Sequence, residues 1–221
     1  MNYLTDKDLK KFGFTFLSTL NERKKKTVKK KNSPKDFKSF GYEFFDGNKF
    51  QVGYQGYYYN KKYFDNVAKN LIKKFKLTTK SNVLDIGCAK GCLMFDLTRY
   101  KIPVEGLDVS FYAKNKAVPQ VKNKIYLNAQ LNKLNKKFDL IIAIHVFNYF
   151  RYSKIDKIIK LLRENAKNNF IIIEVISNRN KKKEFLSSDP NYVIAETQEW
   201  WQKKFDKLNV NTKNIYFRIM A

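Results

Sequence analysis

The chain has few of the residues that form cross-links, metal centres and rigid turns. Its 221 residues include two cysteines, four prolines, eight glycines and one histidine. Cys88 and Cys92 are too close in sequence to join distant segments, and no histidine near them completes the four ligands that a structural zinc site requires. We therefore predict reduced cysteines that pack as small residues, and no metal.

Long hydrophobic runs are also missing. The two nearest candidates, residues 140–144 and 170–176, have the length of a buried strand, whereas a membrane-spanning helix needs about 18–20 apolar residues. The first residues show no apolar segment followed by a small-residue cleavage site. These absences predict a cytoplasmic protein without a membrane span.

Acidic residues are scarce relative to basic ones. The 20 Asp and Glu residues face 45 Lys and Arg residues, giving a net charge of +25. Such a basic protein could bind nucleic acid through its phosphates. The same composition is typical of an A/T-rich coding sequence, because Asn, Ile, Phe and Tyr are abundant too and the lysines are spread along the chain. The positive electrostatic field of such a protein would also attract a small anionic substrate. Composition alone does not decide between a nucleic-acid partner, a small anionic substrate and an A/T-rich genome.

The chain divides into three parts by composition. Residues 1–40 predict a basic, partly mobile arm with a short helix at 5–12. Residues 41–80 predict an ordered aromatic loop at 41–60, whose aromatic residues are too irregularly spaced for a helix or strand, and an amphipathic helix at 63–76. We expect this second part to form a lid, and residues 81–221 to form the main domain.

From residue 82 onward, strand-like apolar runs alternate with helical patterns. This alternation predicts an α/β layered domain with a mostly parallel sheet. The charged stretch around residues 181–190 predicts a surface excursion. The expected strands are 83–86, 104–107, 124–127, 140–144, 170–176 and 214–219, and the expected helices are 93–100, 112–117, 153–166 and 197–208.

The stretch VLDIGCAKGC, residues 83–92, marks a candidate ligand site. In an open parallel sheet, ligands bind beyond the carboxyl ends of the strands. Gly87 allows a sharp turn there and Gly91 allows the backbone to approach a bound group closely. Asp108 ends the second strand 21 residues after Gly87, where an acid can accept hydrogen bonds from ribose hydroxyls. Its alternative role is to cap the helix after Val109.

The glycine spacing fits neither a dinucleotide G-x-G-x-x-G loop nor a phosphate-binding G-x-x-x-x-G-K-S/T loop. D-x-G-x-x-x-G followed by an acid at the second strand instead resembles the S-adenosylmethionine (SAM) loop of class I methyltransferases. The resemblance runs from about residue 53 to the carboxyl end and includes FDLIIAIHVFNYF (138–150) and TQEWWQKKFDKLNV (197–210). Within the class, GYYYNKKYFDNVA, VLDIGCAKG and GLDVSFYA are most similar to methyltransferases encoded with bacterial surface-polysaccharide and nucleotide-sugar genes.

The resemblance implies a Rossmann-like, mostly parallel seven-stranded sheet with an antiparallel last strand. It also implies SAM as cofactor, released as S-adenosyl-L-homocysteine. The cofactor-binding residues that it implies are Asp85, Gly87, Cys88, Ala89, Gly91, Asp108, Val109, Asn128, Ala129, Gln130, Ala143 and Ile144.

His145, the only histidine, opens from the fourth strand into this site and is a candidate general base. The alternative is a histidine packed at a strand end. Asn148 and Tyr149 are predicted to orient substrate or to cap the following helix. The lid residues predicted to contact the ligands are Tyr54, Tyr57, Tyr59 and Lys62, with core packing or solvation as their alternatives.

The favoured function is methyl transfer to a small polar acceptor, a hydroxyl of a sugar or of a nucleotide-linked sugar. An RNA methyltransferase is the first alternative, supported by the charge, and a non-catalytic SAM-binding subunit is the second. The sequence leaves the oligomeric state open.

Overall fold

A computed structural model describes residues 8, 12–13, 35–48, 53–127, 134 and 136–220 of the chain. Within these residues six strands form one sheet in the order β3-β2-β1-β4-β5-β6. The strands are β1 (Val83–Ile86), β2 (Val104–Asp108), β3 (Ile125–Leu127), β4 (Phe138–Ile144), β5 (Ala166–Val175) and β6 (Ile215–Ile219).

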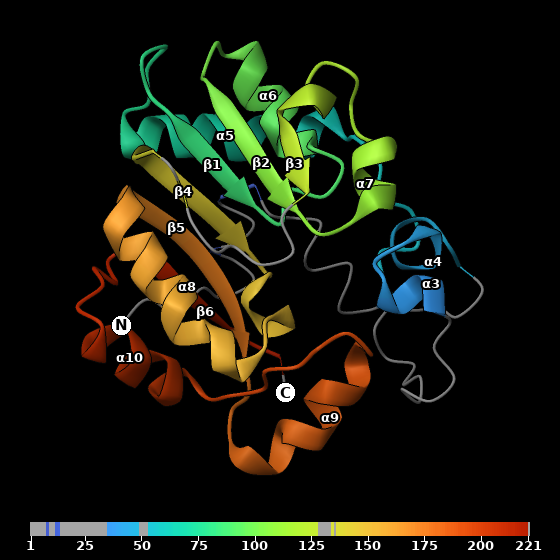
Figure 1. Ribbon diagram of the computed structural model, residues 1–221, viewed down its shortest axis with the longest axis vertical. Helices are drawn as coiled ribbons and strands as arrows, with labels where there is room; N and C mark the ends of the chain where they lie inside the picture. The colour runs from blue at the N-terminus through green and yellow to red at the C-terminus, as the bar shows by residue number, and fades with distance from the viewer. Residues whose placement is uncertain are drawn as a thin grey trace.

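Helices cover both faces of the sheet (Figure 1). One face carries α5 (Lys61–Phe75) and α6 (Cys92–Arg99), and the other carries α8 (Tyr152–Asn165) and α10 (Gln198–Lys207). The shorter elements are α3 (Lys35–Lys38), α4 (Tyr42–Phe45), α7 (Phe111–Asn115), α9 (Lys182–Ser188) and the 3-10 turns Lys122–Lys124, Phe147–Tyr149 and Arg179–Lys181. The α/β architecture predicted from the sequence is therefore present.

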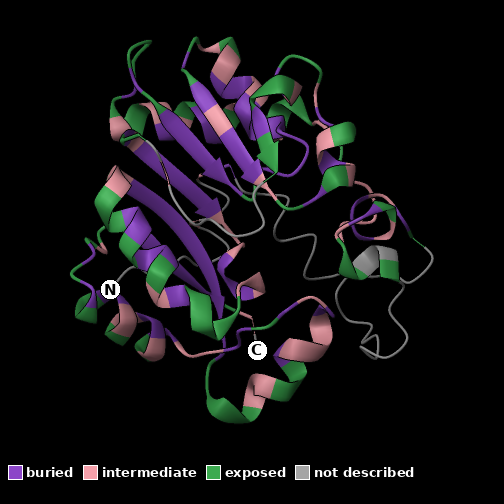
Figure 2. Cartoon of the chain, in the orientation of Figure 1, coloured by how far each residue is buried: buried purple, intermediate pink, exposed green. Residues whose placement is uncertain are grey.

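The strands alternate strictly between the two layers, because successive side chains of a strand point to opposite faces. On β4, for example, Leu140 and Ile142 pack under α5 and α6, whereas Ile141 and Ala143 pack under α8 and α10. Both sets are buried, and most of the sheet is coloured as buried in Figure 2. This double burial explains the unbroken apolar runs of the sequence.

The predicted seven strands with an antiparallel last strand are wrong for the described part of the chain. Every strand pair there is parallel, and β6 lies directly beside β5, with Ile171 opposite Ile215. The reason is the connection: β5 leads into α9 and then α10, and this crossover returns the chain to the starting edge of the sheet before β6 begins.

Two further local expectations need correction. The aromatic stretch 41–60 contains a helical turn, α4, that buries Phe44 and Phe45. The predicted surface excursion near residues 181–190 contains α9, which is anchored by the buried side chain of Phe185. Phe44 and Phe45 pack against distant segments that include Ala89 and Ala113. Phe185 packs against Ile176, Tyr192 and Ala195, which lie within ten residues of it.

Helix ends position the loops that matter for the site. Asn60 accepts a hydrogen bond from the Tyr63 amide and begins α5, and Ser110 accepts one from the Ala113 amide and begins α7. The segments α3, α4 and α9 lie beyond the arrowhead ends of the strands (Figure 1). The carboxyl edge of the sheet is therefore covered by the N-terminal segment and by α9. No described helix is long and apolar enough to span a membrane.

Candidate active site

The loop that leaves β1 turns back over the sheet edge. Gly87, Ala89 and Gly91 all adopt positive φ, at 74°, 51° and 72°. A Cβ atom on Gly87 would approach the Val146 Cγ2 atom to 2.8 Å, so both its conformation and its surroundings require glycine. The Gly87 amide donates to the Leu107 carbonyl at 2.7 Å, which joins this loop to the end of β2.

The predicted approach of Gly91 to a bound group stays a prediction, and the structure shows a close contact of another kind. A Cβ atom there would lie 2.8 Å from Val121 Cγ2, within the protein, and Gly91 lines neither of the cavities described below. Gly91 is the N-cap residue of α6 and adopts a left-handed backbone conformation there. The close contact that the structure shows is between two segments of the chain.

Asp108 ties the loops after β1 and β2 together. Its Oδ2 atom accepts a hydrogen bond from the Ala89 amide, and its Oδ1 atom accepts one from the Ser110 amide, both at 2.8 Å. Burial raises the pKa of Asp108, and the hydrogen bonds from Ser110, Ala89 and Val109 oppose that rise. The carboxyl group therefore sits at a desolvated sheet edge with backbone donors holding its orientation.

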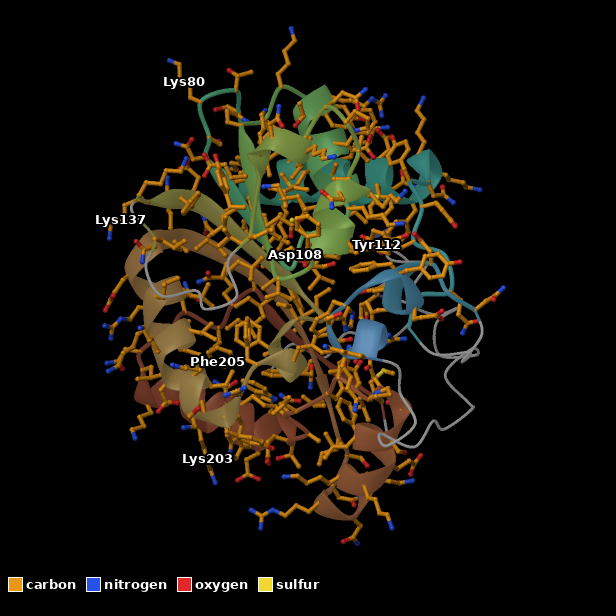
Figure 3. The ribbon with its side chains drawn as sticks, turned by 45° about the vertical axis from the view of Figure 1, so that its right-hand side comes forward. Lys80, Asp108, Tyr112, Lys137, Lys203 and Phe205 are labelled. Atoms are coloured by element: carbon orange, nitrogen blue, oxygen red, sulfur yellow. The ribbon has the colours of Figure 1, made fainter. Side chains whose placement is uncertain are left out.

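A cavity of about 530 Å³ opens beside Asp108. One wall comes from the ends of β1, β2 and β4 and includes Gly87, Ala89, Asp108, Val109, Ile144 and His145. The opposite wall is aromatic and comes from the N-terminal segment, with Phe40, Phe44, Phe45 and Tyr54. Asp108 and Tyr112 lie on the side of the sheet edge that faces α3 and α4, whereas Lys80, Lys137 and Lys203 project from the outer surface (Figure 3). This volume is in the range of small-molecule sites.

A second, smaller cavity of about 80 Å³ shares Gly87, His145 and Tyr54 with the first. Asp85 and Cys88 line it from the sheet, and Tyr57 lines it from the N-terminal segment. Burial, reinforced by the nearby charge of Asp108, raises the pKa of Asp85 to about 8. Asp85 is therefore largely protonated at neutral pH, and a cation placed beside it would favour its ionised form.

His145 follows β4 with a positive φ of 54°. Its amide donates to the Ile172 carbonyl at 2.9 Å, and its Nδ1 atom lies 3.2 Å from Glu174 Oε1. His145 lines both cavities. A residue other than glycine in this backbone region is uncommon and is frequent at functional sites.

The aromatic wall is fastened to the site by a buried ion pair. Both carboxylate oxygens of Asp46 lie 2.6 Å from the Lys90 Nζ atom, and the two side chains are only 9% and 7% exposed. Asp46 also accepts hydrogen bonds from the Tyr112 hydroxyl at 2.7 Å and the Tyr57 amide at 3.2 Å. Burial by itself would raise the pKa of Asp46, but the hydrogen bonds from Lys90 and Tyr112 outweigh it and lower the pKa.

A second attachment joins the same segment to α7. The Ser110 hydroxyl donates to the Phe40 carbonyl while it caps the helix through Ala113. Residues 35–48 and 53–59 contact the loop after β1 and the start of α7. They are called the lid below, after the role that the sequence predicts for residues 41–80. Closing contacts of this kind exclude water from a site.

The sequence profile described as "Methyltransferase domain" matches residues 54–212, which is most of the chain. The chain belongs to this methyltransferase-domain family. No curated protein matches the sequence at a significant level.

Solved structures share the fold of this methyltransferase domain. The YcgJ protein from Bacillus subtilis is 17% identical, with 64% of this chain and 66% of that chain covered and a TM-score of 0.50. A SAM-dependent methyltransferase from Clostridium acetobutylicum is 21% identical, with coverages of 49% and 47% and a TM-score of 0.42. CalS10, an amino pentose methyltransferase from Micromonospora echinaspora, is 15% identical, with coverages of 47% and 46% and a TM-score of 0.40.

The chain spans about half the length of the Clostridium acetobutylicum protein, 47%. At 17% identity, the likeness to the YcgJ protein shows the fold alone. What this methyltransferase domain binds and modifies has to be argued from its own residues.

Several predicted site residues of the methyltransferase domain lie at the cavities. They are Asp85, Gly87, Cys88, Ala89, Asp108, Val109, Ile144, His145, Tyr149, Tyr54 and Tyr57. Asn128, Ala129 and Gln130 lie outside the described residues. The structure thus brings together residues from four separate stretches of sequence.

Other predicted site residues lie elsewhere. Ala143 is buried within β4 and lines neither cavity. The Tyr59 hydroxyl donates to Asp96 Oδ1 at 2.9 Å, so this side chain joins the lid to α6. Lys62 is exposed at the start of α5 and also lines neither cavity. Among the alternatives weighed for these lid side chains, Tyr59 follows packing and Lys62 follows solvation.

Asn148 does not reach the cavities. Its side chain is fully buried, and its Nδ2 atom donates to the carbonyls of Glu174 at 2.9 Å and Ile194 at 3.0 Å. Its Oδ1 atom accepts from the Glu174 amide at 3.3 Å. The contact of Asn148 with substrate stays a prediction, while its side-chain amide joins β5 to the segment before α10. Tyr149 does line the larger cavity, and its hydroxyl donates to Asp189 Oδ2 at 2.9 Å.

Sequence reasoning missed the ion pair between Asp46 and Lys90, and it missed Glu174. The ion pair joins residues 44 positions apart, and no local pattern connects them. Glu174 did carry a signal, since it is the only charged residue in the apolar run FIIIEVI of β5. Among the described residues no group of three or more His, Cys, Asp and Glu side chains could hold a metal ion.

Proposed function

We propose that the chain is a SAM-dependent methyltransferase that methylates a small polar acceptor, a hydroxyl of a sugar or of a nucleotide-linked sugar. The observation that carries this proposal is the larger cavity, whose sheet-side wall holds both Asp108 and His145. A ribose acceptor and a candidate base thus face one space. The cofactor would leave as S-adenosyl-L-homocysteine.

The residues at the sheet edge fit SAM. Asp108 lines the cavity with a carboxyl group that its backbone donors hold in place, and a carboxylate of this kind accepts hydrogen bonds from ribose hydroxyls. Asp85 lines the adjoining small cavity, where a carboxyl group suits the positively charged methionine end. The backbone beside Gly87 and Ile144 would complete that end of the site. Asn128, Ala129 and Gln130 remain predicted contacts of the adenine ring.

When bound, SAM supplies a methyl carbon on a positively charged sulfur, from which an acceptor oxygen displaces the sulfur in line. The chain's own tasks are to align the acceptor, to exclude water and to remove the acceptor's proton. The lid serves the first two tasks, because it closes the cavity with Phe40, Phe44 and Tyr54. His145 serves the third from the end of β4.

The acceptor side of the cavity is both aromatic and polar. Tyr54 and Tyr149 line it near His145, and Arg151 and Lys154 line it from the start of α8. Aromatic faces pack against the apolar faces of sugar rings, and exposed cations suit phosphate groups. This combination favours a nucleotide-linked sugar over a neutral apolar acceptor.

An RNA acceptor is the second candidate, and the observation that favours it is the net charge of +25. The lid argues against it, because a flipped base would have to enter a cavity whose outer wall is pinned by the buried pair of Asp46 and Lys90. A non-catalytic SAM-binding subunit would keep Asp108 but would have no need of His145 at the cavity.

Transfer of labelled methyl groups distinguishes these functions. The purified chain would be incubated with methyl-labelled SAM and with either the small-molecule fraction or the total RNA of its source cells. We expect label in small anionic molecules and none in RNA, and we expect His145→Ala to remove most of it. Label confined to RNA would overturn the acceptor class, and SAM binding without transfer to either fraction would favour the non-catalytic subunit.

A further inference from the structure

Glu174 is a buried acid that faces the candidate base. It lies near the carboxyl end of β5, 3% exposed, and its Oε1 atom is 3.2 Å from His145 Nδ1. The contact joins neighbouring strands, since β4 pairs with β5 and His145 follows β4 directly. The two groups form a charged contact when the ring is protonated, and the acid accepts the Nδ1 proton once the ring plane turns toward Oε1.

The carboxylate of Glu174 has its own partners. Arg218 lies opposite it in register on β6, and the Arg218 Nη1 atom is 3.8 Å from Glu174 Oε1, with both side chains buried. The Tyr192 hydroxyl donates to the other oxygen, Oε2. Burial, together with the charges of Glu174 and Asp189, raises the pKa of Tyr192 well above its ordinary value, so this hydroxyl remains a donor. A buried carboxylate needs such partners to stay ionised.

The backbone holds both members in place. The Glu174 amide donates to Asn148 Oδ1, and the Asn148 amide group returns a hydrogen bond to the Glu174 carbonyl. His145 is held in its left-handed backbone conformation by the hydrogen bond from its amide to Ile172. Strained backbone at a cavity wall persists only where the surrounding structure fixes it. The fold therefore constrains the ring and the acid from two sides.

We infer that Glu174 is a positioning residue for His145, which fixes the imidazole as the tautomer that carries its proton on Nδ1. This inference rests on the proposed function, because it gives His145 its role as base. With Nδ1–H donated to Glu174, the lone pair of the neutral ring is on Nε2, and Nε2 is the atom that takes the proton from the acceptor hydroxyl. The positive charge that the ring then gains faces a carboxylate. In the other tautomer the lone pair of Nδ1 would face the carboxylate. Nε2 would then already carry a proton and could not accept the one from the substrate.

The inference can be tested without knowing the acceptor, since His145 is the only histidine of the chain. Nitrogen-15 NMR of the full-length chain, at a pH where the ring is neutral, reports directly which ring nitrogen carries the proton. We expect the Nδ1–H tautomer to dominate. A dominant Nε2–H tautomer, which is the usual form of free histidine, would overturn the inference.

The matched variants separate a positioning role from a structural one. Glu174→Met combined with Arg218→Met removes both buried charges together, which avoids leaving Arg218 as a buried cation without its acid. We expect this double variant to lose the Nδ1–H preference while its thermal unfolding stays cooperative. Tyr192→Phe removes only the donor to the far oxygen and should keep the preference. If the double variant also keeps it, Glu174 does not set the tautomer.

Failure of this inference is distinguishable from failure of the proposed function. Calorimetric titration with SAM on the same samples tests the function alone. SAM binding with an Nε2–H ring overturns the role of Glu174 and leaves the function standing. An Nδ1–H ring in a chain that does not bind SAM supports the hydrogen bond to Glu174 and overturns the proposed function.

Discussion

The two walls of the larger cavity are built in different ways. The wall that we propose to bind the cofactor, called the cofactor wall below, comes from the loops after β1 and β2 and consists mainly of backbone, glycine and one carboxyl group, Asp108. The lid wall comes from residues 35–48 and 53–59 and consists of aromatic side chains. It is held by Asp46, which reaches Lys90 from 44 positions away.

One wall is therefore determined by local backbone geometry and the other by long-range side-chain contacts. The cofactor wall depends on turns and strand ends, which a short stretch of sequence determines through glycine and hydrogen-bonding geometry. The lid wall depends on long-range contacts whose members carry no common local pattern. Variants in the cofactor wall should therefore affect binding of the cofactor, and variants in the rest of the site should affect closure and the chemical step.

The largest effect is expected from Asp108→Ala. Removing the carboxylate deletes the proposed ribose acceptor and leaves the Ala89 and Ser110 amides without their partner, so SAM binding should be lost to calorimetry while thermal unfolding remains cooperative. Glu105→Ala, on the same strand but in an exposed pair with Lys136, is the matched control and should bind normally. Unchanged affinity in Asp108→Ala would remove this residue from the cofactor wall.

His145→Ala should come next and should act on the chemical step alone. Loss of a general base typically slows the reaction by about 10²–10⁴-fold, whereas SAM affinity should change by less than about twofold. Single-turnover transfer of labelled methyl to the small-molecule fraction measures the first quantity and calorimetry measures the second. If the rate stays the same, the base lies elsewhere.

Lys90→Met tests the lid. It leaves the Asp46 carboxylate buried without its cation, and breaking a buried pair in this way costs about 3–5 kcal/mol. We expect faster amide hydrogen exchange in residues 35–48, with β1 and β4 unaffected, and SAM affinity lower by about tenfold. Lys136→Met breaks an exposed pair and serves as the control, because such pairs contribute less than about 1 kcal/mol. Equal exchange in both variants would show that the ion pair does not hold the lid.

The smallest expected effect is the release of a proton from Asp85 when SAM binds. Asp85 has a pKa raised to about 8 by burial, so it holds a proton at neutral pH in the free chain. The positive charges of SAM should displace that proton, and binding should release part of a proton per chain near pH 7 and tighten as the pH rises toward 8. Calorimetry in buffers of different ionisation enthalpy measures the release. Asp85→Asn should abolish it, and the same release in this variant would assign the proton to another group.

The same pKa has a consequence for folding. The folded-state pKa lies above the ordinary value of 3.8, so the contribution of Asp85 to stability is fully present below that value and is lost as the pH rises through about 8. Asp85→Asn should therefore flatten the decline of the melting temperature between about pH 5 and pH 8. An identical decline in both proteins would show that Asp85 is not the group responsible.

The sequence predicted the cofactor wall better than the lid. VLDIG and Asp108 lie at strand ends, where double burial makes the apolar run unmistakable and where the following glycine must turn. Gly91 shows the limit of such reasoning, because a required glycine does not say whether a ligand or the protein, here Val121, fills the space beside it.

The lid and the environment of His145 depend on contacts between residues that are far apart in the sequence, and no local pattern predicts such contacts. The antiparallel seventh strand, which only the family resemblance implied, is wrong for the described residues, where β6 lies parallel to β5. Asn148 looked like a substrate contact by its place after β4, yet its amide joins two buried backbone segments. Glu174 could have been singled out, since an acid within an apolar strand needs a buried partner.

The central claim is that the cavity beside Asp108 binds SAM, and calorimetric titration of the full-length chain with SAM tests it most directly. The account predicts one SAM per chain, competition by S-adenosyl-L-homocysteine, and no binding of a nicotinamide dinucleotide under the same conditions. Absence of SAM binding by a folded chain, or preferential binding of the dinucleotide, would contradict it.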